Sequence, residues 1–173
     1  MTTIDLADKI RNIADFPIPG VQFKDITTLL SDPASFRQVI DGFAERYAKR
    51  GVTAVAGIES RGFIFSAPLA YRLGVPLVPI RKVGKLPAAT YQVAYELEYG
   101  SATLEIHRDA FVPDAQVVIV DDLLATGGTV AAAAQLVEMA GAVVNEVAFV
   151  VELSFLGGRE RLKPRSIFAM VSY

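Results

Sequence analysis

The chain has 173 residues, 52% of them hydrophobic, and a formal net charge of −2, so it can form one domain with its own core and has no charge excess suited to nucleic acid or anionic membranes. It contains no cysteine and a single histidine, which excludes disulfides, thiol catalysis and a zinc site with several histidines. No apolar run reaches the ~18 residues of a membrane span and no secretory signal is recognisable, so we expect a cytoplasmic protein that binds neither nucleic acid nor membrane.

Residues 4–13 predict a short amphipathic helix, which the two prolines and the glycine of DFPIPG (15–20) then end. Asp32 and Pro33 have the character of an N-cap and a first helical residue. The apolar residues that follow recur at helical spacing and predict a second helix that ends near Gly51.

From residue 52 onward, short apolar runs alternate with helix-like segments. The runs are 52–57, 75–80, 117–120 and 143–153, and the helices between them are 63–73 and 129–140. This alternation predicts βαβ units, and hence an α/β fold with a central parallel sheet flanked by helices. Residues 81–105 differ, because they are charged and show little periodicity. A long segment of this kind inside a compact domain is either functional or disordered.

The most informative stretch is VVIVDDLLATGGTVAAA (117–133), in which a buried strand leads into two acids and then into a glycine-rich turn at a helix start. Ligands bind beyond the carboxyl ends of strands in open parallel sheets, where these acids emerge. Glycines allow a tight turn, threonine hydroxyls add donors, and a helix N-terminus favours an anion. The turn therefore predicts a phosphate site formed by Ala125, Thr126, Gly127, Gly128 and Thr129.

Asp121 and Asp122 would repel a bare anion, so they need a different task. Carboxylates accept hydrogen bonds from vicinal hydroxyls, and a ribose attached to the phosphate would supply these hydroxyls. The motif is neither a Walker loop nor a dinucleotide-binding GxGxxG. The simpler alternative is an ordinary strand–turn–helix with solvated acids, which leaves the paired acids, glycines and threonines unexplained together.

VVIVDDLLATGGT resembles the signature with which type I phosphoribosyltransferases bind phosphoribosyl pyrophosphate (PRPP). Other segments resemble adenine phosphoribosyltransferases in particular, in the expected order and over nearly the whole chain. These segments are DFPIPGVQFKDIT (15–27), ESRGF (59–63), RKVGKLP (81–87), LEYG (97–100), LEI (104–106) and VVEL..LGGRE (150–160). The resemblance implies one phosphoribosyltransferase domain over 1–173, with a base-covering hood at 1–30 and a mobile loop at 81–105.

The resemblance also implies a reaction in which adenine and PRPP give AMP and pyrophosphate, with Mg²⁺ held mainly by PRPP and water rather than by protein ligands. It places Arg61 against the pyrophosphate, in a loop that often contains a cis peptide bond. It assigns Arg81, Lys82 and Lys85 to the region that closes over PRPP, some of them reaching the neighbouring subunit of a homodimer.

For the base, the resemblance implies that backbone groups around Phe23 and Lys24 read the edge of adenine. Leu123 and Leu156 would pack on its faces. Glu98 and Tyr99 belong to the closing loop, with Glu98 as the candidate for handling a proton of the purine; the alternative for Glu98 is a solvated loop acid.

Other functions remain open at this point. One is a transferase acting on another base, such as xanthine, hypoxanthine or orotate, which the short region 15–27 and the LEYG segment disfavour. A second is a regulator that senses PRPP, but the chain has no spare length or basic face for nucleic acid. A third is a plain nucleotide-binding module, which does not explain the lysine-rich segment 81–85.

Overall fold

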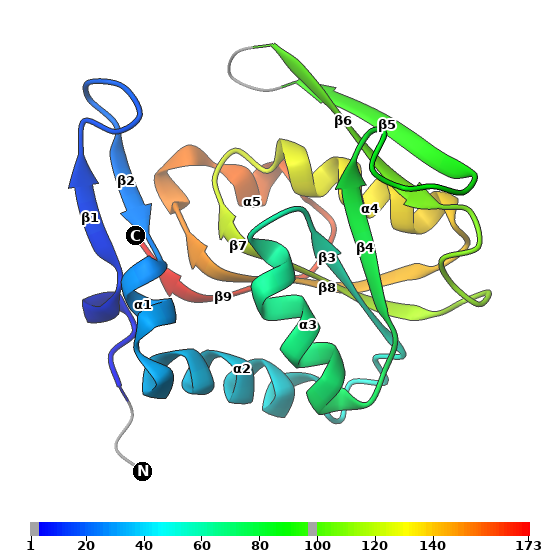
Figure 1. Cartoon of the computed structure of the whole chain (residues 1–173), viewed down its shortest axis with the longest axis horizontal. Coiled ribbons are helices and arrows are strands. Elements are labelled where there is room, and N and C mark those ends of the chain that lie inside the picture. Colours follow the sequence, from blue (N-terminus) through cyan, green and yellow to red (C-terminus); the bar gives the residue numbers. More distant parts are fainter. Residues whose placement is uncertain (1–3, 97–99) are drawn as a thin grey trace. The chain divides into compact units, whose positions relative to one another are not determined.

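The computed structural model describes residues 4–96 and 100–173 (Figure 1). The chain divides into two compact units, one up to Gly42 and one from Phe43 onward. Helix α2 (Pro33–Tyr47) runs across this boundary, and Asp32 caps it as expected, since its carboxylate accepts hydrogen bonds from the Ala34 N–H at 3.2 Å and the Ser35 hydroxyl at 2.7 Å. No helix in the described ranges combines the length and the apolar character that a membrane crossing requires.

The first unit begins with the 3-10 turn η1 (Ala7–Lys9), followed by the antiparallel strands β1 (Arg11–Ala14) and β2 (Gln22–Asp25) and helix α1 (Thr27–Ser31). The helix predicted for residues 4–13 is therefore wrong. A helix of ten residues is marginal by itself, and residues 11–14 instead pair with β2 across the turn that the prolines and glycine form.

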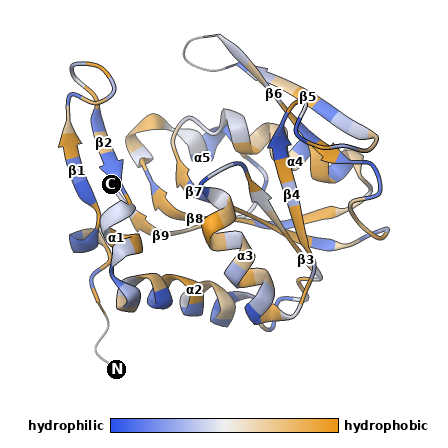
Figure 2. Ribbon diagram, in the orientation of Figure 1, coloured by the Kyte–Doolittle hydropathy of each residue, from blue (hydrophilic) through white to orange (hydrophobic). Residues whose placement is uncertain are grey.

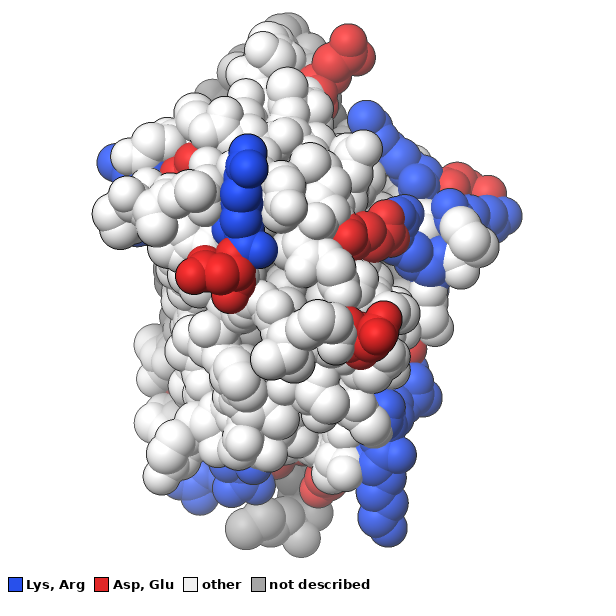
Figure 3. All heavy atoms as spheres, turned by 90° about the vertical axis from the view of Figure 1, so that its right-hand side faces the viewer, with Lys and Arg blue, Asp and Glu red and all other residues white. Residues whose placement is uncertain are grey.

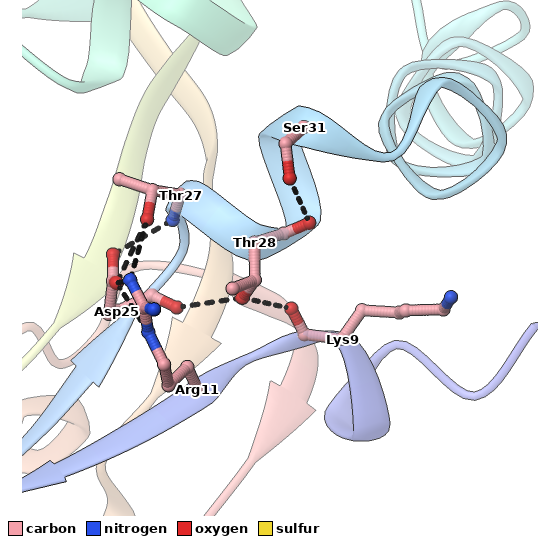
Figure 4. Close-up of polar contacts among 6 residues, drawn as sticks. All are labelled: Lys9, Arg11, Asp25, Thr27, Thr28 and Ser31. Carbon is pink, nitrogen blue, oxygen red and sulfur yellow. Dashed lines mark hydrogen bonds and ion pairs between the residues drawn. The ribbon is translucent and has the colours of Figure 1, made fainter.

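Asp25 joins the hairpin to α1 (Figure 4). Its carboxylate accepts hydrogen bonds from Arg11 Nη2 at 2.5 Å, the Thr27 N–H at 2.9 Å and the Thr27 hydroxyl at 2.8 Å. The hydroxyl of Thr28 donates to the Lys9 carbonyl at 2.7 Å. The hydrogen bond from Arg11, followed by those from Thr27, lowers the pKa of Asp25 to about 2. The strand that carries Phe23 is thus tied at its end to the following helix.

The second unit is built on one seven-stranded sheet with the order β5-β6-β4-β3-β7-β8-β9. Strands β4, β3, β7, β8 and β9 are parallel neighbours, whereas β5 and β6 form an antiparallel pair that joins β4. The strands and helices of this unit, in chain order, are β3 (Ala54–Ile58), α3 (Gly62–Leu73), β4 (Leu77–Lys82), β5 (Thr90–Glu96), β6 (Ser101–His107), β7 (Gln116–Leu124), α4 (Gly128–Met139), β8 (Val143–Glu152), η2 (Ser154–Leu156), α5 (Gly158–Arg161) and β9 (Ile167–Ser172).

The core lies around the central strands. Every residue of β3 is buried, and residues 117–120 of β7 are fully inaccessible. Helix α3 packs against β3 and β7, and α4 packs against β5 to β8. Figure 2 shows how hydrophobic these strands are, as expected for parallel strands covered on both faces. The predicted parallel sheet with flanking helices is confirmed.

The described part of residues 81–105 includes two strands that the sequence pattern did not indicate. These residues contain β5 and most of β6, paired from Thr90 opposite His107 to Glu96 opposite Ser101. The turn before β5 is held by the buried carboxylate of Glu105, which accepts the N–H groups of Lys85 and Leu86, both at 2.9 Å. A buried acid that satisfies backbone donors cannot be recognised from hydrophobic periodicity. Closure of this region over a ligand stays a prediction.

Candidate active site

The carboxyl ends of the parallel strands β4, β3, β7 and β8 meet at one edge of the sheet (Figure 1). Residues 59–61 follow β3, the acids and the glycine-rich turn lie at the end of β7, and Lys82 ends β4. Three segments separated by 20 to 60 positions in the sequence are therefore neighbours in space, at the position where open α/β sheets bind ligands.

The phosphate loop, which we define as residues 125–129, turns from β7 into α4. Gly127 is the N-cap of α4 and has φ of +82°, a left-handed conformation that favours glycine. It has no side chain that could occupy the first N–H groups of the helix, so these groups remain free to bind an anion. The turn into a helix N-terminus expected from the sequence is therefore present, and its binding of phosphate stays a prediction.

The two acids differ in their surroundings. Asp122 is buried and forms a short hydrogen-bonded ion pair with Nε of Arg61. Asp121 accepts the N–H of Asp122 at 2.9 Å. Burial, and then repulsion by the neighbouring Asp122, raises the pKa of Asp121 well above its ordinary value. The charged form of Asp121 is therefore disfavoured, and hydrogen bonds donated by ribose hydroxyls would stabilise it. This agrees with a ribose site.

The loop after β3 is held close to β7. A Cβ atom at Gly62 would lie 2.7 Å from the Val120 carbonyl oxygen, so only glycine permits this approach, which brings the preceding Arg61 to Asp122. The peptide bond between Glu59 and Ser60 is cis, which confirms the expectation for this loop. The sequence did not indicate the Arg61–Asp122 pair, because it joins residues 61 positions apart.

Glu59 connects the loop to β4. Its carboxylate accepts the Lys82 N–H at 3.0 Å and Nε of Arg81 at 3.2 Å. Burial acts to raise the pKa of Glu59, but these hydrogen bonds outweigh it and lower the pKa below its ordinary value. Arg81, predicted to contact PRPP, therefore contacts the edge of the site through Glu59.

These segments enclose a cavity of about 350 Å³. Many of the predicted site residues line it, namely Arg61, Lys82, Asp121, Asp122, Leu123, Ala125, Thr126, Gly127, Gly128 and Thr129. Glu59, Ser60, Tyr95 and Phe149 line it as well, although the sequence did not single them out. Glu59 and Ser60 adjoin Arg61 and could have been included with it, whereas Phe149 is indistinguishable from a core residue of its strand.

Other predicted residues lie elsewhere. Lys85 and Leu156 do not line this cavity. Phe23 and Lys24 lie on β2 of the first unit. Glu98 and Tyr99 lie outside the described residues, so their assignments stay predictions.

A glycine-rich turn that follows two acids, with two leucines between them, at the carboxyl edge of a parallel sheet is the arrangement of a type I phosphoribosyltransferase. The sequence model of the family described as "Phosphoribosyl transferase domain" matches residues 25–171. The class of protein is thereby defined.

The relatives identify the family more closely. The adenine phosphoribosyltransferase of Chloroflexus aurantiacus is 66% identical over 173 residues, all of both chains. The crystal structure of adenine phosphoribosyltransferase from Thermoanaerobacter pseudethanolicus has a TM-score of 0.94 with 50% identity over 98% of each chain. The enzyme from Saccharomyces cerevisiae, solved with D-2,5-dideoxy-2,5-imino-altritol 1,6-bisphosphate and adenine, has a TM-score of 0.91 with 40% identity over 96% of each chain.

The chain therefore belongs to the adenine phosphoribosyltransferase family. It is a transferase of purine salvage that forms AMP from adenine and PRPP. Of the functions left open by the sequence, this family selects the enzyme that acts on adenine, over other bases and over a PRPP sensor.

Proposed function

We propose that the cavity at the carboxyl edge of the sheet is the PRPP site of this adenine phosphoribosyltransferase. The phosphate loop binds the 5′-phosphate, and Asp121 and Asp122 accept the ribose hydroxyls. The observation that carries this proposal is that the helix N-terminus and the acid pair line one cavity. The yeast relative was solved with a bisphosphate of a sugar analogue, a ligand of the same chemistry.

Departure of pyrophosphate from the anomeric carbon leaves an oxocarbenium-like ribose, so the site must stabilise charge on the leaving group. Arg61 lines the cavity with its side chain half exposed, which leaves guanidinium donors beyond Nε for the pyrophosphate. Lys82 lines the same cavity. Lys85 and Arg81 contribute from the closing region.

We further propose that Mg²⁺ is the cofactor and that PRPP oxygens and water hold most of it. Mg²⁺ keeps several waters and is commonly bound through substrate phosphates. Among the described residues, no cluster of three or more acidic, histidine or cysteine side chains could hold a metal ion. When bound, the ion neutralises charge on the pyrophosphate as it leaves.

For adenine, we propose that the hood at residues 1–30 covers the base and that backbone groups near Phe23 and Lys24 read its edge. Leu123 and Leu156 contact its faces. Glu98 shares the purine proton, and Tyr99 lies beside it in the sequence of the closing region. A cytoplasmic location also stays a prediction.

Calorimetric titration with two ligands tests the phosphate and metal assignments together. We expect Thr126→Ala to weaken binding of ribose 5-phosphate by about tenfold, since a hydrogen bond to a charged group contributes about 1.5–3 kcal/mol. We expect PRPP, but not ribose 5-phosphate, to bind more tightly with Mg²⁺.

Thr103→Ala is the matched control for Thr126→Ala, because Thr103 is half buried on β6 and does not line the cavity. If Thr126→Ala and Thr103→Ala changed the affinity for ribose 5-phosphate equally, this result would contradict the role of the loop in binding phosphate. PRPP binding that is independent of Mg²⁺ would contradict the role of the metal.

We predict a homodimer in which Lys85 acts in the partner's site. Lys85 does not line the cavity of its own chain. The second unit exposes the large apolar side chains Tyr71, Leu77, Val83 and Val112. The face drawn in Figure 3 has broad uncharged areas between scattered Lys, Arg, Asp and Glu side chains. Such a surface suits association between copies.

Sedimentation should give twice the chain mass at micromolar concentration. Mixing the Lys85→Gln variant with the double variant Asp121→Asn/Asp122→Asn should restore activity. In each mixed dimer, one site would contain the intact acids of one chain and the intact Lys85 of the other. A fully active monomer would rule out the dimer. A proven mixed dimer without recovered activity would rule out the exchange of Lys85.

A further inference from the structure

The segment that follows β8 packs directly against the phosphate loop. A Cβ atom at Gly158 would come within 2.2 Å of the Ala125 carbonyl oxygen and 2.9 Å of Leu124 Cδ1. A Cβ at Gly127 would in turn lie 2.8 Å from the Gly158 carbonyl oxygen. The backbones of the loop and of α5 are therefore in direct contact, with glycine on both sides. Because this contact leaves no space for a side chain, a movement of α5 toward the loop would displace the loop backbone.

One ion pair holds α5 in this position. Glu152, the last residue of β8, is 4% exposed. Its carboxylate accepts Nε of Arg159 at 2.9 Å and Nη2 of Arg159 at 2.5 Å. The hydrogen bonds from Arg159 lower the pKa of Glu152 in spite of burial, so the carboxylate is charged and both oxygens are engaged.

The pair also reaches the neighbouring strands. The hydroxyl of Ser172 on β9 donates to Glu152 at 3.3 Å, and Nη1 of Arg159 donates to the Ile167 carbonyl at 3.2 Å. The strand that carries Glu152 is itself registered on β7, with Leu124 opposite Glu152. Arg159, which is the residue after Gly158, is therefore linked to the strand pair β7 and β8 from which the phosphate loop emerges.

We propose that Glu152 and Arg159 are positioning residues of the phosphate loop, which act through Gly158 to hold residues 125–129 in the conformation that binds the 5′-phosphate. This inference rests on the proposed function of the loop. Neither residue lines the cavity, so neither touches PRPP. Their effect on PRPP comes through the backbone contact alone.

Steady-state kinetics of Arg159→Gln test the inference. We expect the Michaelis constant for PRPP to rise about tenfold, because small displacements of a binding group cost between ten- and a hundredfold in rate or affinity. Ribose 5-phosphate should bind about tenfold more weakly in calorimetry. Arg159→Lys, which keeps the charge but not the paired hydrogen bonds, should lie between parent and Arg159→Gln.

Arg165→Gln is the matched control. Arg165 also forms a paired ion bridge, with Glu138 Oε1 at 2.7 and 3.1 Å, and neither partner lines the phosphate cavity. A purely structural loss would lower the fraction of folded enzyme, which reduces apparent turnover but leaves the Michaelis constant for PRPP unchanged. Thermal unfolding of each variant measures that fraction independently.

Gly158→Ala provides the second variant, because it alters the contact without removing a charge. An increase in the Michaelis constant for PRPP in both Arg159→Gln and Gly158→Ala supports the inference. If folded Arg159→Gln had the same Michaelis constant for PRPP and the same affinity for ribose 5-phosphate as the parent, the inference would be overturned. If Thr126→Ala also left ribose 5-phosphate binding unchanged, the proposed phosphate site itself would be wrong, which separates the two failures.

Discussion

Replacing Asp121 and Asp122 together by asparagine is expected to lower kcat/KM for PRPP by about 100-fold, with little change in the Michaelis constant for adenine. Amides still accept hydrogen bonds, but they lose the charge that strengthens acceptance from ribose hydroxyls. Losing a charged partner in a buried site costs about 2–5 kcal/mol, and each 1.4 kcal/mol is tenfold. Steady-state kinetics with each substrate varied separately provide the measurement.

The control is Asp109→Asn/Asp114→Asn, the same substitutions at two exposed acids between β6 and β7. These acids precede β7, at the opposite end of the strand from Asp121. PRPP kinetics that match those of this control would show that the acid pair only caps the strand.

The pH dependence provides a further check on Asp121. Its pKa is raised by burial and by Asp122, so as the pH falls it becomes protonated at a higher pH than an ordinary aspartate does. A protonated carboxyl is a weaker acceptor for ribose hydroxyls than a carboxylate. The Michaelis constant for PRPP should therefore rise as the pH falls through this raised pKa. Asp121→Asn should lack that rise, and the difference between variant and parent removes the titration of PRPP itself.

The second large effect is expected for Glu98→Gln, which should lower turnover by about 10²-fold or more, the usual scale of general acid–base help. The basis is the LEYG segment, since Glu98 lies outside the described residues. Glutamine keeps the shape and hydrogen bonding, so the Michaelis constants for both substrates should change little. If Glu98 instead only orders a closing loop, turnover and Michaelis constants should change together.

Glu96→Gln is the matched control, because Glu96 is an exposed acid at the end of β5, two positions away, and does not line the cavity. Turnover of Glu98→Gln within about threefold of the parent, well below the general acid–base range, would remove Glu98 from the chemistry. Catalysis would then depend on the phosphate, metal and Arg61 contacts.

The sequence was sufficient to predict the parallel strands and the glycine-rich turn from β7 into α4, because each strand and this turn are encoded in contiguous residues. Short apolar runs indicate β3, β7 and β8, and the acids, glycines and threonines of the motif all lie within residues 121–129. Their place at the carboxyl edge follows from the rule for open sheets. The cavity that they line agrees with this reasoning.

Tertiary pairing decided two elements that the local pattern did not indicate. Residues 11–14 form a strand because residues 22–25 pair with them, and β5 is a strand because β6 lies beside it. In both cases the stabilising hydrogen bonds come from another segment, and local propensity is too weak to indicate them.

The ion pairs that shape the site were likewise decided only in the folded chain. Arg61 meets Asp122, and Glu152 meets Arg159 in a turn whose glycine contacts the phosphate loop. A charged residue shows its identity in the sequence but not its partner, because the partner depends on where strand ends and turns meet in space. The residues proposed to bind phosphate could therefore be identified within one stretch of the sequence, whereas the residues proposed to hold that stretch in place could be identified only from the packing of the folded chain.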